Sequence, residues 1–129
     1  ELRDYIRKGL LDSHMLPMIA ECDGVPVGYF EMYWTREDRL APYYESEAYD
    51  RGFHFLIGNK DFLGFKNTDS ILKCLSHFLF LDEVRTRKIM AEPRADNQKV
   101  LKYLKFDFPH KRAALLECRR EVFFMGDYL

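Results

Sequence analysis

The sequence predicts one domain of the α+β class, in which strands and helices form mixed layers. An Asp-Gly pair at positions 23–24 lies between two apolar runs, residues 18–22 and 25–34, and such a pair suits the tight turn of a β-hairpin. Apolar residues recur at helical spacing over residues 70–81 and predict a mostly buried helix. The length of 129 residues fits one domain and is too short for two full cores.

The first half of the chain predicts a helix before the hairpin and another strand after it. Leucine and isoleucine share helical spacing over residues 2–11, which predicts a short helix. Residues 35–50 are rich in charged side chains and tyrosine and are predicted to form an ordered excursion from the sheet. The apolar run at 53–57 predicts a short strand that ends at Gly58.

A loop and the buried helix are predicted to follow this strand. Residues 59–67 contain one glycine, Gly64, and show neither a helical nor a strand period, so they predict a loop. Thr68 or Asp69 is predicted to cap the helix over 70–81, because short polar side chains accept hydrogen bonds from the first free amides of a helix.

The last part of the chain predicts further strands around one more helix. Residues 88–92 predict a strand, and Asp96 or Asn97 is predicted to cap the helix that follows it. Residues 106–108 and 113–124 predict the two final strands.

Composition excludes several classes of function. Twenty Lys and Arg against 21 Asp and Glu leave no broad basic field, so nucleic acid is not expected as the main partner. No apolar run approaches the ~20 residues that a membrane span needs. The three cysteines form no CxxC pair or Cys/His cluster, so we expect reduced thiols in a cytoplasmic protein, with no metal site and no disulfide framework.

The unit of strand, Gly58, loop and helix is a candidate anion site. The start of a helix presents free backbone N–H groups to phosphate or pyrophosphate. Gly64 would let the backbone approach the anion, and Lys66 would add a positive charge. Neither a P-loop nor a dinucleotide fingerprint is present, and on spacing alone a plain strand–loop–helix connection is the favoured alternative.

His54 and Asp96 are the candidates for proton transfer and substrate contact. Because side chains alternate along a strand, His54 points away from the face that carries Phe53 and Phe55. Histidine exchanges protons near neutral pH, but a lone strand histidine more often has a structural role, which is the favoured alternative from the sequence alone. Asp96 stands between a strand and a helix, where capping is the alternative to a role in a site.

Five segments, taken together and in order, point to a family. They are ECDGVPVGYFE (residues 21–31), EDRLAPYY (37–44), YDRGFHFLIG (49–58), EPRADN (92–97) and FDFPHKRA (106–113). The chain resembles the siderophore-biosynthesis N-acyltransferases of the GNAT superfamily, the aerobactin-type hydroxylysine acetyltransferases. The resemblance covers nearly the whole chain, and five ordered segments are far more specific than any single motif.

The resemblance implies a GNAT-like fold, with a largely antiparallel central sheet flanked by helices and splayed to admit an acyl-CoA. Acetyl-CoA or another acyl-CoA is then the co-substrate, and no metal is required. The strand with His54 would pair with the pantetheine arm, and residues 59–67 with the start of the next helix would hold the pyrophosphate. The cofactor-binding residues that this implies are Leu56, Ile57, Gly58, Gly64, Lys66, Asn67, Thr68 and Asn97.

The resemblance also implies the reaction. The acyl group would pass directly to the side-chain amine of N-hydroxylysine or a similar hydroxylated diamine, giving a hydroxamate in siderophore biosynthesis. His54 would accept the proton and Asp96 would bind or orient the acceptor, with Trp34, Asp38 and Arg94 as further substrate-binding residues. The partners implied are a small-molecule amine and the synthetases of the siderophore pathway, with no membrane.

Two departures from the family pattern bear on these expectations. Residues 62–67 (FLGFKN) are poorer in Arg, Gln and Gly than the usual GNAT phosphate loop, and Tyr103-Leu104 runs directly into Lys105-Phe106. We therefore expect residues 1–129 to be a single acyl-CoA N-acyltransferase domain that lacks its N-terminal elements and a short segment near 104–105. The alternatives are an N-acetyltransferase for another amine, such as an aminoglycoside or a polyamine, and a non-catalytic CoA-binding module.

Overall fold

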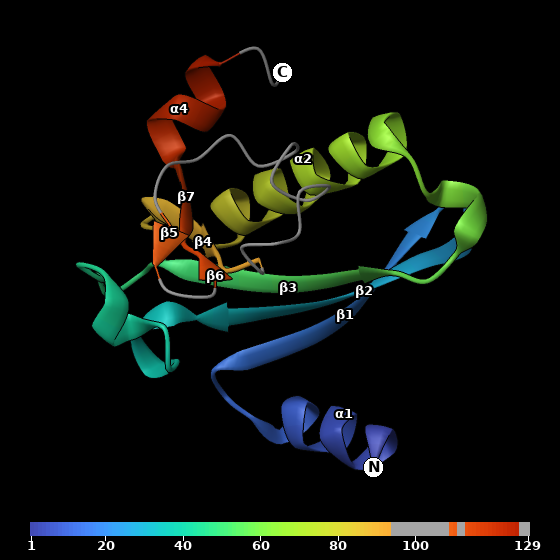
Figure 1. Cartoon of the computed structure of the whole chain (residues 1–129), viewed down its shortest axis with the longest axis horizontal. Helices are drawn as coiled ribbons and strands as arrows, with labels where there is room; N and C mark the ends of the chain where they lie inside the picture. Colours follow the sequence, from blue (N-terminus) through green and yellow to red (C-terminus); the bar gives the residue numbers. More distant parts are fainter. Residues whose placement is uncertain (94–108, 111–112, 127–129) are drawn as a thin grey trace.

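A five-stranded sheet forms the centre of the molecule, with helices on both of its faces (Figure 1). The computed structural model describes residues 1–93, 109–110 and 113–126. The sheet order is β1-β2-β3-β4-β7, and only the pairing of β3 with β4 is parallel. The prediction of an α+β fold with a largely antiparallel sheet is therefore confirmed.

The hairpin of β1 (Met15–Cys22) and β2 (Val25–Trp34) forms as its turn signal predicts. Asp23 and Gly24 both have positive φ angles, 50° and 78°, as a two-residue hairpin turn requires. The strand β1 begins at Met15, three residues before the predicted start, because it pairs with β2 back to Tyr33.

The strand β3 (Arg51–Ile57) pairs with β2 along its whole length, from Trp34 opposite Arg51 to Gly28 opposite Ile57. Its other neighbour, β4 (Lys88–Ala91), pairs with it only at Arg51 and Gly52. The remaining strand, β7 (Leu116–Arg119), pairs antiparallel with all of β4, and β5 (Pro109–His110) pairs separately with β6 (Ala113–Ala114).

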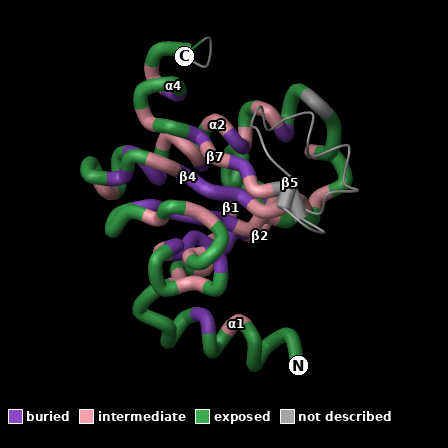
Figure 2. Tube along the Cα trace, turned by 60° about the vertical axis from the view of Figure 1, so that its left-hand side comes forward, coloured by how far each residue is buried: buried purple, intermediate pink, exposed green. Residues whose placement is uncertain are grey.

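One face of the sheet is covered by α2 (Phe65–Asp82), and the hydrophobic core lies between them. The other face carries α1 (Leu2–Leu11), which forms as predicted and buries only Gly9 (Figures 1 and 2). The core residues are Phe30, Met32, Phe53, Leu72, Leu75, Leu79, Phe80, Ile89, Ala91, Leu116, Cys118 and Phe123.

The predicted start of α2 is wrong. The helix begins at Phe65 rather than residue 70, and its N-cap is Gly64, which has a φ of 125°. A glycine at this angle lets the chain turn directly into the helix, where most L-residues would be strained. Thr68 and Asp69 consequently lie in the first turns of the helix instead of capping it, and Thr68 is buried.

The predicted final strand is also wrong beyond residue 119. Residues 120–125 form α4 (Arg120–Met125), because Arg120 Nη1 donates to the backbone oxygens of Phe80 and Thr86, at 2.8 and 3.3 Å. Phe123 is buried against Phe80, with 5.4 Å between ring centroids. The strand predicted at 106–108 and the helix predicted from Asp96 or Asn97 lie outside the described residues.

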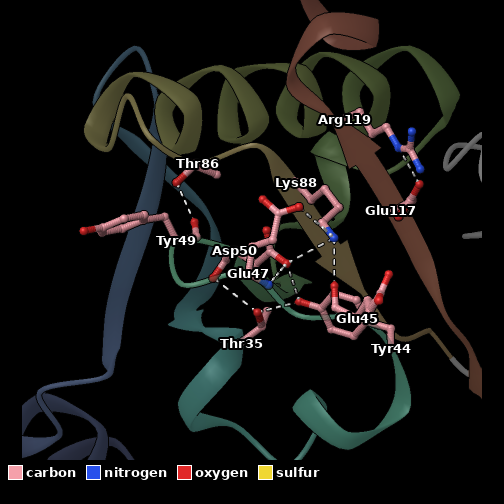
Figure 3. Close-up of polar contacts among 10 residues, drawn as sticks. All are labelled: Thr35, Tyr44, Glu45, Glu47, Tyr49, Asp50, Thr86, Lys88, Glu117 and Arg119. Carbon is pink, nitrogen blue, oxygen red and sulfur yellow. Dashed lines mark hydrogen bonds and ion pairs between the residues drawn. The ribbon is translucent and has the colours of Figure 1, made fainter.

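The excursion between β2 and β3 is ordered and contains two 3₁₀ turns, Thr35–Glu37 and Ala41–Tyr43. A buried polar cluster around Asp50 fastens it to the sheet (Figure 3). One oxygen of Asp50, Oδ2, accepts hydrogen bonds from Tyr44 Oη at 3.0 Å and from the Glu47 amide at 2.9 Å, and lies 3.5 Å from Lys88 Nζ. Lys88 comes from β4, so the cluster ties the excursion to the strand beyond β3.

Two features are absent from the part of the chain that the structure describes. No helix there has both the length and the apolar character that crossing a bilayer demands. Among the same residues, no group of three His, Cys, Asp or Glu side chains is placed to hold a metal ion.

The ion pair of Lys88 with Asp50 predicts a sizeable contribution to stability. Replacing Lys88 with Met leaves the fully buried Asp50 carboxylate without its counter-charge, and we expect the free energy of unfolding in urea to fall by about 3 kcal/mol. The matched control is Arg87→Met at the exposed neighbouring position, which should change it by less than about 0.5 kcal/mol. Equal effects of the two substitutions would contradict this role of Lys88.

Candidate active site

His54 faces a buried carboxylate across two adjacent strands. Glu31 on β2 is directly opposite His54 on β3, so their side chains project from the same face of the sheet, the face away from α2. His54 Nδ1 lies 3.3 Å from Glu31 Oε2. The Glu31 side chain is 5% exposed and that of His54 is 43% exposed, so the pair joins a buried anion to an accessible imidazole.

Two tyrosine hydroxyls complete the environment of Glu31. Tyr5 from α1 donates to Oε2 at 2.9 Å, and Tyr29 from β2 donates to Oε1 at 2.8 Å. Burial, followed by the hydrogen bond to Glu31, raises the pKa of Tyr29 to about 12, and the same two causes raise the pKa of Tyr5. Both hydroxyls therefore keep their protons near neutral pH and act as donors to the carboxylate.

This arrangement determines which nitrogen of His54 can act as a base. Since the carboxylate of Glu31 accepts hydrogen bonds, we assign the imidazole proton to Nδ1. Nε2 is then free to accept a proton, and it faces Glu92, whose Oε1 is 3.7 Å away. The ring of Tyr33 packs beside the imidazole, with 5.0 Å between centroids.

The place of Tyr33 depends on a glycine. Gly52 is opposite Tyr33 in the ladder, and a Cβ at position 52 would lie 2.3 Å from atoms of the Tyr33 ring. Only glycine therefore lets this ring lie flat across β3 and reach His54. Burial, followed by the charge of Glu92, raises the pKa of Tyr33, whose hydroxyl remains protonated.

An open strand edge begins at residue 53, one residue before His54. Since β4 pairs with β3 only at Arg51 and Gly52, residues 53–57 have ladder partners on the β2 side alone within the described chain. The Gly58 amide donates to Val27 O at 3.0 Å, so the amides of Ile57 and Phe55 point to the open edge by alternation. Such an edge can pair with an extended ligand that carries amide groups.

The start of α2 offers an anion site near the end of the same strand. The first intrahelical hydrogen bond runs from the Thr68 amide to Gly64 O at 3.0 Å, so the amides of residues 65–67 have no partner within the helix. The first turn contains no acidic residue, and Lys66 is exposed there. The helix dipole and these amides favour a phosphate group at this end.

Comparison with known proteins identifies the family. Residues 1–112 match the family model described as an acetyltransferase (GNAT) domain. The chain belongs to the GNAT acetyltransferase family. The family resemblance found in the sequence is thus confirmed.

Relatives of this GNAT domain include enzymes named for hydroxylysine and hydroxyornithine. The N(6)-hydroxylysine O-acetyltransferase of Escherichia coli is 36% identical over 93% of this chain and 41% of its own length. The N(5)-hydroxyornithine:cis-anhydromevalonyl coenzyme A-N(5)-transacylase of Beauveria bassiana is 40% identical over 95% of this chain and 29% of its own length. The chain thus spans less than half the length of either relative.

A solved structure shows the same fold. An uncharacterized protein of Bacillus halodurans is 32% identical and superposes with a TM-score of 0.85, over 95% of this chain and 67% of that one. The arrangement of strands and helices in this GNAT domain is therefore shared with an experimental structure.

The GNAT domain brings some predicted site residues together and separates others. His54, Leu56 and Ile57 lie along the open edge, while Gly64, Lys66, Asn67 and Thr68 form the start of α2. The Gly58 amide already donates to Val27 O, so it is not free to bind a cofactor group. Arg94, Asp96 and Asn97 lie outside the described residues.

Two of the predicted substrate-binding residues differ in their relation to His54. Trp34 lies opposite Arg51 on the α2 face of the sheet, and the guanidinium of Arg51 stacks over it at 4.0 Å, so the structure does not bring Trp34 to His54. The Asp38 carboxylate accepts a hydrogen bond from the Leu40 amide at 3.0 Å. It adjoins Arg39, whose Nη2 lies 3.8 Å from Glu92 Oε1, the oxygen that faces His54.

Glu31 and Glu92 are the main site residues that sequence reasoning missed. A signal for Glu31 existed, because it is a charged residue inside the apolar run of β2 and shares a strand face with Tyr29 and Tyr33. Glu92 follows β4 directly, and its position was noted only as part of a motif.

An apolar cavity near these elements does not contain the site. It has a volume of about 320 Å³ and lies between the β1–β2 hairpin and α2. Neither His54 nor Glu31 lines it. Its lining residues are Met18, Ile19, Ala20, Glu21, Cys22, Val27, Phe30, Phe62, Asn67, Ser70, Ile71, Cys74, Leu75 and Phe78.

The contact of Glu31 with His54 predicts the imidazole tautomer. A Gln at position 31 offers one acceptor oxygen to three donors, so Glu31→Gln should convert a single Nδ1–H tautomer into a mixture. Imidazole ¹H–¹⁵N correlation spectra of the labelled domain measure this directly. Glu21→Gln, at an exposed position in β1, is the control, and an unchanged His54 spectrum in Glu31→Gln would exclude the assignment.

Proposed function

We propose that this GNAT domain transfers an acyl group from acyl-CoA to the side-chain nitrogen of an N-hydroxylated lysine- or ornithine-like amine, giving a hydroxamate. The observation that carries the proposal is the position of His54, an accessible imidazole held by a buried carboxylate beside an open strand edge. The named relatives act on hydroxylysine and hydroxyornithine, which supports this class of acceptor.

The acyl-CoA is proposed to lie along the open edge of β3. The amides of Phe55 and Ile57 would pair with the amide groups of the pantetheine arm, and Leu56 would contact it from the same strand. The pyrophosphate would lie at the start of α2, where Gly64 admits it and Lys66, Asn67 and Thr68 surround it. Asn97 stays a proposed contact of the cofactor.

The acceptor suits a weak base such as His54. An alkyl amine such as lysine, with a pKa near ~10.4, must lose a proton before it can attack a thioester. A hydroxylamine is far less basic and arrives neutral, so the domain needs only to position it and to remove one proton during the reaction. Asp96, Asp38 and Arg94 stay proposed contacts of the acceptor, whereas Trp34, on the α2 face of the sheet, is no longer among them.

The transfer is proposed to be direct. The acceptor nitrogen attacks the thioester carbon, the C–S bond breaks, the nitrogen proton passes to His54 Nε2, and CoA leaves as the thiol. Cys118 is unsuited to a covalent intermediate, because burial raises the pKa of its thiol to about 12. The exposed free thiols of Cys22 and Cys74 suit the reducing cytoplasm, where siderophore synthetases would consume the product.

Thiol-release assays with several acceptor amines, run in parallel, test the proposed function. We expect release of CoA thiol from acetyl-CoA with N6-hydroxylysine or N5-hydroxyornithine, and little release with lysine, an aminoglycoside or spermidine. Release with one of the latter amines alone would overturn the acceptor class. CoA binding without turnover on any amine would instead indicate a non-catalytic module.

His54 is expected to be essential for turnover but not for cofactor binding. Replacing His54 with Ala removes the proton acceptor, and kcat should fall by about 10²- to 10⁴-fold while the dissociation constant of CoA stays the same. Thiol release and calorimetric titration measure the two quantities. His14→Ala, at an exposed histidine beside α1, should behave as the wild type, and equal turnover of the two variants would remove His54 from the mechanism.

Lys66 is expected to affect the binding of acetyl-CoA and not the rate of the chemical step. Lys66→Gln removes an exposed charge from the proposed pyrophosphate site, so the KM for acetyl-CoA should rise by about fivefold with kcat nearly unchanged. Steady-state kinetics over a range of acetyl-CoA concentrations measure both constants. Lys8→Gln on α1 is the matched control, and a KM equal to that of the control would place the pyrophosphate elsewhere.

A further inference from the structure

His54 Nε2 and Glu92 Oε1 lie side by side, and with the imidazole proton assigned to Nδ1 both can accept a hydrogen bond from a ligand. The Nδ1–H of His54 is committed to Glu31, so Nε2 presents a lone pair towards Glu92 Oε1 at 3.7 Å. That distance is beyond hydrogen-bond reach. The side chains are 43% and 20% exposed, so both acceptors are accessible to a ligand.

Glu92 also lies near a cation, Arg39. Arg39 Nη2 lies 3.8 Å from the same oxygen, Oε1, that faces His54, and the Arg39 side chain is 83% exposed. The positive charge near Glu92 is therefore carried by a solvent-exposed side chain. An acceptor pair of this kind is suited to a neutral group with two donors.

A group with donors on two adjacent atoms matches this pair. An N-hydroxy amine carries an N–H and an O–H on directly bonded atoms, whereas a plain neutral amine carries all its donors on one nitrogen. We propose that Glu92 binds the hydroxyl of the N-hydroxylated acceptor while His54 Nε2 binds its N–H. The inference rests on the proposed function and makes Glu92 the residue that selects a hydroxylated over an unmodified amine.

The same contacts would direct the acyl group to nitrogen. The hydroxyl keeps its proton in the hydrogen bond to Glu92, and the N–H points to the base, which leaves the nitrogen lone pair to attack the thioester. The N–C bond forms as the C–S bond breaks, and the proton that His54 takes up is available to the departing thiolate. Glu92 therefore disfavours the O-acyl product without taking a proton itself.

Binding without acyl-CoA tests the proposal independently of turnover. The dissociation constants of N6-hydroxylysine and N6-methoxylysine are measured by calorimetric titration, since the methoxy compound lacks the O–H donor. We expect the wild-type domain to bind the hydroxy compound about tenfold or more tightly, the effect of one hydrogen bond to a charged group. Equal dissociation constants in the wild type would overturn the proposal, and this comparison requires no variant.

A matched pair of variants assigns the preference to Glu92. In Glu92→Met, which has a side chain of similar length and no carboxylate, the tenfold preference should disappear. In Glu37→Met, at an exposed position in the first 3₁₀ turn, it should remain. A preference that persists in Glu92→Met would overturn the role of Glu92, since it would then arise from the bulk of the methyl group.

Turnover separates this inference from the proposed function. A wild-type domain that prefers the hydroxy compound but releases no thiol from acetyl-CoA with it would uphold the role of Glu92 in binding and overturn the acyl transfer. Where turnover occurs, the O-acyl share of the product should rise in Glu92→Met. An unchanged product ratio would overturn the proposed control of the acylated atom.

Discussion

The register between β2 and β3 is the constraint on which the site depends. Seven residues of β3 pair with β2, and this alignment sets Glu31 against His54 and Tyr33 against Gly52. A slip of one residue would move each side chain of β3 to the opposite face of the sheet. His54 would then enter the apolar core, and Phe53 and Phe55 would face solvent.

This register is itself maintained by the core. Phe30 and Met32 flank Glu31 and are buried under α2 together with Phe53, so the residues that stabilise the sheet alternate with those that form the site. A buried carboxylate is costly unless it is fully hydrogen-bonded, and Tyr5 and Tyr29 meet that requirement on the opposite face. Stability and chemistry are thus divided between the two faces of the same strands.

Features that depend on local chemistry could be predicted from the sequence. The Asp-Gly turn of the hairpin, the helix at the start of the chain and the side of β3 on which His54 lies all depend on residues close together in the sequence. The start of α2 was missed because it depends on the unusual backbone angle of Gly64. α4 was missed because Arg120 and Phe123 are held by residues of α2, about 40 positions away.

The site residues likewise include some that a single segment of the sequence predicts and others that depend on contacts between strands. His54 could be named from its own strand, but its partner Glu31 lies 23 positions away and is brought to it only by the ladder. Glu92 reaches the site from a third strand, and Arg39 from the excursion. Cross-strand contacts of this kind require the register, which no single segment of the sequence contains.

The small buried surface of α1 has a thermodynamic consequence. This helix buries only Gly9, yet its Tyr5 supplies one of the two hydroxyls on Glu31. Segments with so little buried surface open locally far more often than the whole domain unfolds. Each such opening withdraws a donor from Glu31, so docking of α1 and the contact of Glu31 with His54 are linked equilibria, and a ligand that favours one must shift the other.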